Sequence, residues 1–275
     1  MTTAAPTRVP VPADARVTWW RVVRSEWIKF RTLRSSLLLL AATVVVFAAL
    51  GLGFSAFLSD ATIEPGTPAP PGGPSSLDPL GASLGGVNLA QLLVGTLGVL
   101  LVAGEYTTGT IRSSLAAVPR RWPVLGAKVV VLAGVCLAVL VPTVLLTFLG
   151  GQGVLGDEGI SLGDEGVLRA VLGTAVHLAG VGVLGMALGA LLRTTAGALT
   201  SLVALLLVLP GVVSLLPEAW SDAISPYLPS NAGQAFMSIS SDPELLSPGA
   251  GLAVFVGWLV ALLGVAVVRL LRRDA

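Results

Sequence analysis

Six uncharged apolar runs, each long enough to cross a membrane, constrain this chain more than any other feature. At 1.5 Å per residue, a helix of about 20 residues crosses the roughly 30 Å hydrocarbon layer while its backbone groups bond to one another. Strands of a membrane barrel would alternate apolar and polar residues, which these runs do not. The sequence therefore predicts an all-α integral membrane protein whose transmembrane domain, 36–268, has spans at about 36–58, 86–104, 129–150, 170–192, 197–216 and 249–268.

Composition supports a lipid environment. Only 11% of the 275 residues are charged, and 54% are hydrophobic, whereas soluble domains carry about 25% charged residues. The one cysteine, Cys136, falls inside an apolar run, so a disulfide within the chain and a cysteine metal cluster are both excluded.

The basic residues predict the orientation. Every Lys and Arg except Arg169 falls on one side of the predicted spans, and most acidic residues fall on the other. The positive-inside rule makes the basic side cytoplasmic, so both termini are expected inside a multi-pass protein of the plasma (inner) membrane. The net charge of +1 conceals this asymmetry, and nothing in it suggests a nucleic-acid partner.

Two cytoplasmic tails and an amphipathic segment flank the spans. Residues 1–16 are rich in Pro, Thr and Ala and are expected to be a disordered tail; residues 269–275 form the other tail. Residues 17–35 place Trp20, Val23, Trp27 and Phe30 at helical spacing among basic residues that include Lys29 and Arg31. This pattern predicts an interfacial helix in contact with membrane lipids. The alternative is a positively charged flank of the first span.

No catalytic or metal-binding constellation is recognisable. The phosphate-binding pattern G-x-x-x-x-G-K-[ST] is absent, so the chain is not expected to bind ATP in that manner, to hold a cofactor or to be an enzyme. His177 lies inside the fourth span, where an ionisable residue suggests function. The other interpretation is a neutral imidazole bonded to a neighbouring helix. The small residues Gly182, Gly185 and Gly189 of the same span favour helix packing.

The most informative segment is Gly104–Arg121, between the second and third spans. Gly109 is expected to break the second helix, Thr110 to cap a short helix over 111–117, and Pro119 to end it. Glu105 is expected to pair with Arg112 or with a basic residue of a partner. The alternative is a stiff intracellular turn. A second short helix is predicted near 231–238, in the last outer loop.

The Gly104–Arg121 segment resembles the ABC-2 type transporter permease family, whose second intracellular stretch has a Glu, a Gly-Thr pair, a short helix and a Pro-Arg end. Glu105, Gly109, Thr110, Leu115, Pro119 and Arg120 match it in place. The segments SEWIKFRTLRSS at 25–36 and LPSNAGQAF at 228–236 also resemble the family's entry helix and the stretch before its last span.

The resemblance implies a dimeric membrane subunit, with a second identical or different permease subunit, that binds two cytoplasmic ABC ATPase subunits and exports a substrate. Mg-ATP would then be held by the ATPase partners. In relatives the short helix docks on the ATPase, which implicates Glu105, Gly109, Thr110, Ile111, Arg112, Leu115, Pro119 and Arg120. Relatives line the pathway with spans two and five; together with His177 of span four, the candidate pathway residues are Asn88, Gln91, Thr96, His177, Thr200, Ser201 and Ser214.

Two other function classes remain open on sequence alone. An ATP-independent secondary transporter or channel predicts buried charges in the spans or inverted repeats. A non-transporting membrane anchor or sensor for an ATPase complex predicts ATPase binding without transport.

Overall fold

The computed structural model describes residues 18–59, 78–110, 122–239 and 245–272. Within these ranges, six helical stretches are long and apolar enough to cross a membrane, so the predicted all-α membrane fold is confirmed. They are α2 (Arg34–Ser59), α3 with α4 (Pro79–Leu84 and Val87–Thr108), α6 (Trp122–Leu155), α7 (Val167–Leu192), α8 with η2 and α9 (Thr195–Val203, Ala204–Val208 and Leu209–Val213) and α12 (Pro248–Arg272). The short elements are α1 (Trp19–Thr32), η1 (Gly156–Glu158), α10 (Glu218–Ile224), η3 (Ser225–Tyr227) and α11 (Pro229–Met237).

Several helices run beyond their apolar runs. α6 begins at Trp122 and continues without interruption past Pro142 to Leu155. The second span starts with α3, where the Asp78 carboxylate accepts a 2.7 Å hydrogen bond from the Gly81 amide. It then bends at Gly85 and Gly86, where side chains would collide with α2. Hydrophobicity locates the membrane core of a span, whereas capping and packing decide where its helix ends.

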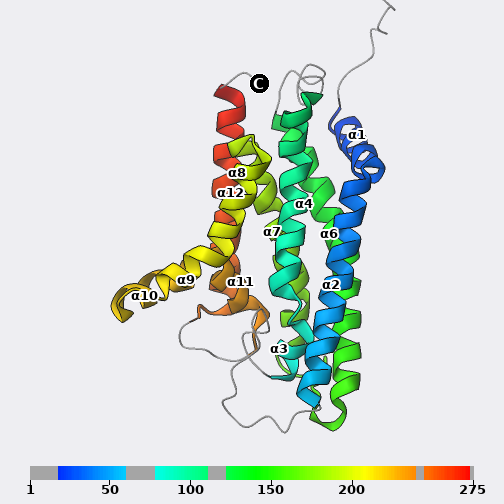
Figure 1. The fold of residues 1–275 in the computed structure, drawn as a ribbon, viewed down its shortest axis with the longest axis vertical. Helices are drawn as coiled ribbons and strands as arrows, with labels where there is room; N and C mark the ends of the chain where they lie inside the picture. The colour runs from blue at the N-terminus through cyan, green and yellow to red at the C-terminus, as the bar shows by residue number, and fades with distance from the viewer. Residues whose placement is uncertain (1–17, 60–77, 111–121, 240–244, 273–275) are drawn as a thin grey trace, which may run out of the picture.

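The fourth span, α7, occupies the centre of the bundle and packs against α4, α6, α8, α11 and α12 (Figure 1). Its contact with α4 is made backbone to backbone. A Cβ placed on Gly98 of α4 would lie 1.8 Å from the Gly182 carbonyl oxygen, and one on Gly185 would lie 2.2 Å from the Gly95 carbonyl oxygen. The predicted small-residue packing face is confirmed, and α4 supplies its counterpart.

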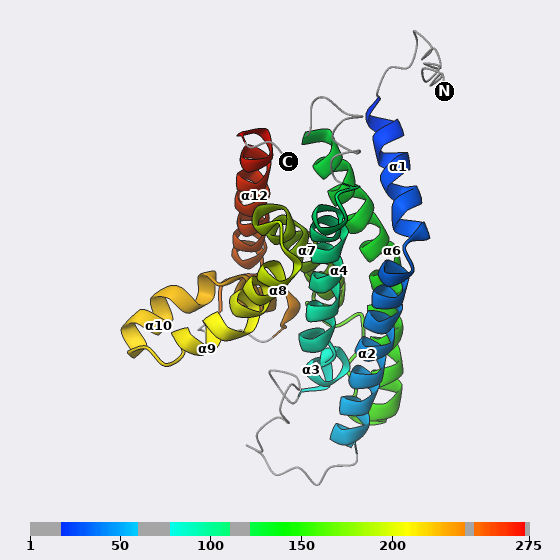
Figure 2. The ribbon, with the colours of Figure 1, turned by 45° about the horizontal axis from the view of Figure 1, so that its top comes forward.

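The fifth span contains one turn of π-helix, η2, between α8 and α9. Pro210 follows this turn as the second residue of α9. Beyond it, α9 and α10 extend away from the bundle in both ribbon views (Figures 1 and 2). The fifth span therefore changes direction at a π-helical turn next to a proline, a common site of helix distortion.

Helix α1 has two distinct faces. Val22, Glu26 and Phe30, at a spacing of four, are buried against the bundle. Trp20 and Trp27 are exposed, with 73% and 43% of their surface accessible. The amphipathic helix expected from the sequence is present, but Phe30 belongs to the buried face, and that face also carries an acidic residue.

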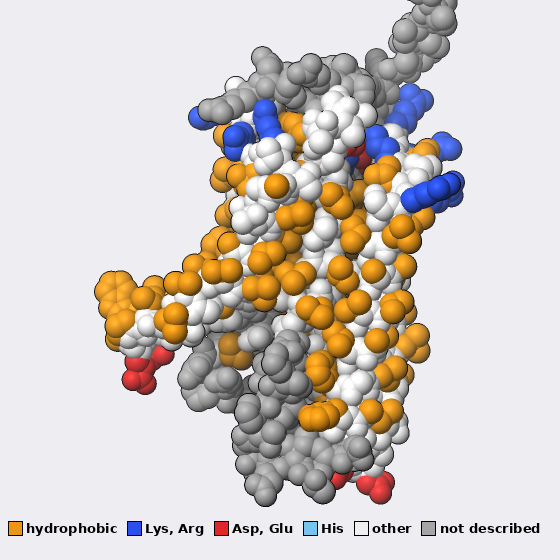
Figure 3. Space-filling model, viewed as in Figure 1, with side chains coloured by type: hydrophobic (Ala, Val, Ile, Leu, Met, Phe, Trp, Pro, Cys, Tyr) orange, Lys and Arg blue, Asp and Glu red, His pale blue; other side chains and the backbone are white. Residues whose placement is uncertain are grey.

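Charge separates along the long axis of the molecule. Lys and Arg side chains gather at the end formed by α1, the end of α4, the start of α6 and the end of α12, and acidic side chains are exposed at the opposite end and on the projecting arm (Figure 3). We call the first of these the basic end. Under the positive-inside rule it is the cytoplasmic end.

Candidate functional site

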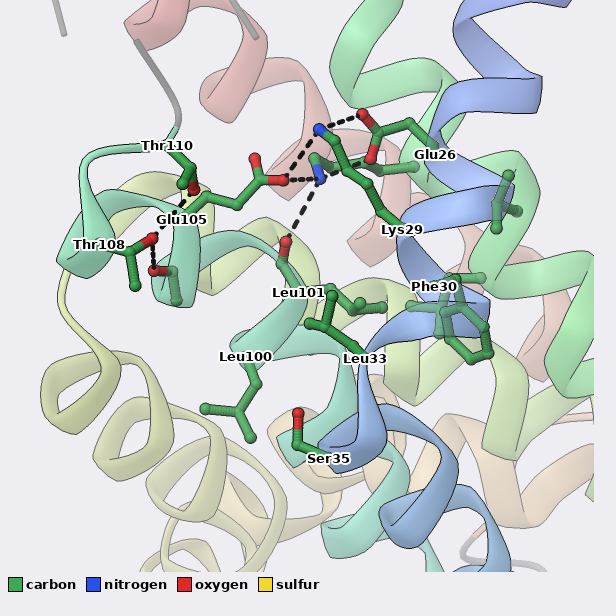
Figure 4. Close-up of a pocket in the computed structure, with 14 residues that line it drawn as sticks. Glu26, Lys29, Phe30, Leu33, Ser35, Leu100, Leu101, Glu105, Thr108 and Thr110 are labelled. Carbon is green, nitrogen blue, oxygen red and sulfur yellow. Dashed lines mark hydrogen bonds and ion pairs between the residues drawn. The ribbon is translucent and has the colours of Figure 1, made fainter. Parts of the chain in front are cut away.

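Four charged side chains from three helices meet at the basic end (Figure 4). Lys128 of α6 places its Nζ 2.7 Å from Glu26 Oε2 of α1 and 2.8 Å from Glu105 Oε1 of α4. Lys29 of α1 places its Nζ 2.8 Å from Glu26 Oε1 and 3.2 Å from the same Glu105 Oε1. We call these residues the Glu-Lys cluster. It ties the interfacial helix α1 to the second and third spans.

Most of the cluster is withdrawn from water. Glu26 and Lys128 each have 6% of their side-chain surface exposed, Glu105 has 14% and Lys29 has 38%. Removing charges from water costs several kcal/mol per ion, so such groups remain charged only when paired. The two carboxylates and two ammonium groups of the cluster pair with one another, and Glu105 Oε2 is the one buried carboxylate oxygen of the cluster without a hydrogen-bond partner among the described residues.

The surroundings of Lys29, outside the spans, favour its charged form. Burial alone would lower the pKa of its ammonium group, but hydrogen bonds and attraction from Glu26 and Glu105 outweigh burial and raise it. Lys29 is therefore charged at neutral pH.

The cluster borders a cavity of about 700 Å³. Its floor is apolar and includes Phe30, Leu101 and Leu132. The hydroxyl-bearing residues Thr108 and Thr110 line its other side, and their Oγ1 atoms lie 2.9 Å apart. The cavity thus connects the cluster with the point where α4 ends.

Tyr106, the residue after Glu105, connects the end of α4 to the end of α7. The Arg193 guanidinium carbon lies 5.3 Å from the centre of the Tyr106 ring, a cation-π contact. Arg193 ends α7 with a left-handed backbone, φ 58°, and Arg269 of α12 donates to the Leu191 carbonyl beside it. Glu105 and Tyr106 therefore connect the end of α4 to α1, α6 and α7.

Helix α4 stops at Gly109, as the sequence predicts. Gly109 has φ 72°, and its amide lies 3.3 Å from the Tyr106 carbonyl oxygen. Glycine adopts this left-handed conformation without the steric penalty of a side chain, which is why it commonly ends helices. The other predicted coupling residues, Ile111, Arg112, Leu115, Pro119 and Arg120, lie outside the described residues.

A protein-family model described as ABC-2 family transporter protein matches residues 87–275. The match runs from the start of α4 to the end of the chain and covers more than half of its length. The chain belongs to this family. Comparison with curated proteins gave no match. It is thus a multi-pass membrane protein of the ABC permease type, and the resemblance carried by Gly104–Arg121 is confirmed.

Two of the candidate pathway residues of this ABC-2 protein meet in the bundle interior. His177 Nε2 lies 3.2 Å from Gln91 Oε1 of α4, and both side chains are buried. The imidazole ring packs 5.0 Å from the Phe255 ring of α12, centre to centre, and a Cβ on Gly233 of α11 would lie 2.2 Å from its Nδ1. His177 thus occupies a tightly packed junction of four helices and contacts a neighbouring helix through Gln91, and its part in a transport pathway stays a prediction.

The remaining pathway candidates have different surroundings. The Thr96 hydroxyl donates to the Leu92 carbonyl, and the Ser214 hydroxyl to the Gly211 carbonyl, each within its own helical segment. Asn88 and Ser201 are half-buried, and Thr200 is exposed on α8. Their part in a transport pathway stays a prediction.

Sequence reasoning missed Glu26 and Lys128. Glu26 is the only acid within the basic α1 segment, and Lys128 stands at the edge of the third apolar run. Each residue therefore departs from the charge or hydrophobicity of its own segment, and this departure could have marked both as candidates. Their pairing across 102 positions was not available from the sequence.

Proposed function

We propose that this chain is the membrane subunit of an ATP-driven exporter that works with separate ABC ATPase subunits and a second permease subunit. ATP, with its Mg²⁺, is bound and hydrolysed by the ATPase subunits. The chain contributes the transmembrane pathway and the cytoplasmic contact through which hydrolysis is coupled to transport.

Family membership and sequence support this division of labour. The chain is an ABC-2 family protein, and its sequence lacks the G-x-x-x-x-G-K-[ST] phosphate cradle. The absence of that cradle from these residues supports assigning nucleotide binding to separate ATPase subunits.

The observation that carries the coupling assignment is the construction of the end of α4. Gly109 stops the helix at the basic end, where the predicted ATPase-docking segment begins. One turn earlier, Glu105 is joined to α1 and α6 through buried ion pairs. Because buried ion pairs transmit displacement better than solvated contacts, a displacement of this segment would move α4, α1 and α6 together.

Purification of the tagged full-length chain from the membranes of its own cells tests the proposal. We expect a P-loop ATPase subunit to co-purify in equimolar amount, and the complex to hydrolyse ATP. Changing the phosphate-binding lysine of that subunit should abolish hydrolysis while leaving this chain in the membrane. ATP hydrolysis by the chain free of any ATPase subunit would contradict the proposal.

A further inference from the structure

A second hollow lies on the other side of α1, between that helix and α6, which lie beside each other in Figure 2. Its volume is about 550 Å³. One wall is the stripe Trp20, Val23, Arg24 and Trp27 of α1, at the spacing of one helix face. The other wall is formed by residues of α6: Val130, Val131, Gly134, Val135, Ala138 and Val139. We call this hollow the α1-α6 groove.

The groove has the dimensions of a lipid chain in one leaflet. Its α6 wall covers nine residue steps, about 14 Å along a helix, and half of the hydrocarbon layer is about 15 Å. Gly134 deepens the middle of this wall, since a Cβ built there would meet no atom within 4 Å. Because α6 is a membrane span, the groove opens toward lipid.

The mouth of the groove carries a positive charge. Arg24 is exposed, and none of the ion pairs among the described residues involves it. Trp20 and Trp27 stand on either side of it along the stripe, and tryptophan favours the headgroup level of a bilayer. A cation above an apolar channel complements a phosphate above an acyl chain.

The walls of the groove are fixed to each other. The buried ion pair between Glu26 and Lys128 joins α1 to α6, and the Trp19 and Trp122 rings stack with their centres 6.2 Å apart. The two walls of the groove are therefore held in a fixed relative position, which lowers the entropic cost of binding a ligand between them.

We propose that the α1-α6 groove binds one anionic phospholipid of the leaflet at the basic end. One acyl chain lies along α6 over Gly134, and the phosphate pairs with Arg24. Bound there, the lipid fills the space between the interfacial helix and the third span. This inference does not depend on the proposed export function.

Native mass spectrometry of the purified full chain with added phosphatidylglycerol or phosphatidylcholine tests the groove. We expect one phosphatidylglycerol to be retained under activation that strips phosphatidylcholine. Gly134→Leu fills the groove and should lower retention on the order of tenfold, the effect of displacing about two methylenes. Arg24→Gln should lower the preference for phosphatidylglycerol about fivefold, the contribution of one arginine near an anionic lipid.

Two matched variants serve as controls. Gly257→Leu adds the same side chain at an open position of α12, and Arg272→Gln removes a charge at the same end of the molecule, so both should retain the lipid as the unchanged chain does. Retention by Gly134→Leu equal to that of Gly257→Leu overturns the groove assignment. An unchanged headgroup preference in Arg24→Gln overturns the assignment of the phosphate, and displacement of the lipid by glycerol phosphate alone overturns the assignment of the acyl chain.

Discussion

Gly98→Leu is expected to yield almost no folded protein. A Cβ at this position would lie 1.8 Å from the Gly182 carbonyl oxygen and 2.9 Å from the Met186 amide nitrogen. Both atoms are backbone, so no side-chain rotation relieves the collision, and α4 must move away from the central helix. The small residues that now allow close packing would then face gaps. We expect a loss of more than about 4 kcal/mol, at the extreme of single substitutions.

Detergent extraction followed by gel filtration measures this effect. Gly53→Leu is the matched control, since a Cβ on Gly53 of α2 meets no atom within 4 Å. The control should elute as a single symmetric peak in normal yield, whereas Gly98→Leu should be degraded or aggregated. A folded Gly98→Leu protein with the stability of the control would show that the α4 and α7 backbones are not in close contact.

Lys128→Met is expected to have the second largest effect. Methionine approximates the volume of lysine, but the substitution leaves the carboxylates of Glu26 and Glu105 buried with only Lys29 between them. Breaking a buried pair by removing one partner typically costs about 3–5 kcal/mol. Lys29→Met should cost much less, about 1 kcal/mol or below, because its side chain is 38% exposed and its pairs are partly solvated.

The double variant Lys128→Met with Glu26→Gln separates charge pairing from packing. It removes one charge of each sign and leaves the pair of Lys29 with Glu105, so it should recover more than half of the stability lost in Lys128→Met. Unfolding in mixed micelles titrated with dodecyl sulfate gives the four free energies of the cycle. If the stability losses of Lys128→Met and Glu26→Gln add up to the loss in the double variant, the cluster does not act as a unit.

The sequence predicted the features that depend on local patterns. Long apolar runs require spanning helices, Gly109 follows from the need for a left-handed residue at a helix end, and α11 follows from the proline-bounded segment before the last span. The small-residue face of α7 was visible in the spacing of its glycines. In each case the cause acts within one helix or one turn.

The features that the sequence did not predict depend on contacts between segments that are distant along the chain. The predicted pairing of Glu105 with Arg112 or with a partner involves residues outside the described ones and stays a prediction. Its pairing with Lys29 and Lys128 of the same chain is a contact that the sequence did not indicate. The helical spacing of Trp20, Trp27 and Phe30 predicts that all three lie on one apolar face of the helix. Tertiary packing divides them, with Phe30 beside Glu26 in the bundle and Trp20 outside it. No property of a single helix indicates which of its faces a neighbour covers.

The central claim, that the end of α4 couples this chain to an ATPase, is tested most directly by comparing Gly109→Val with Gly257→Val in the purified complex. Valine is strongly disfavoured at φ 72°, whereas Gly257 lies within α12, where a Cβ meets no atom within 4 Å. The quantity to measure is the amount of ATPase subunit retained per chain. We predict that Gly257→Val retains it in full and that Gly109→Val, present in the membrane at a normal level, loses most of it. Equal retention by the two variants, with equal rates of ATP hydrolysis, would contradict the account.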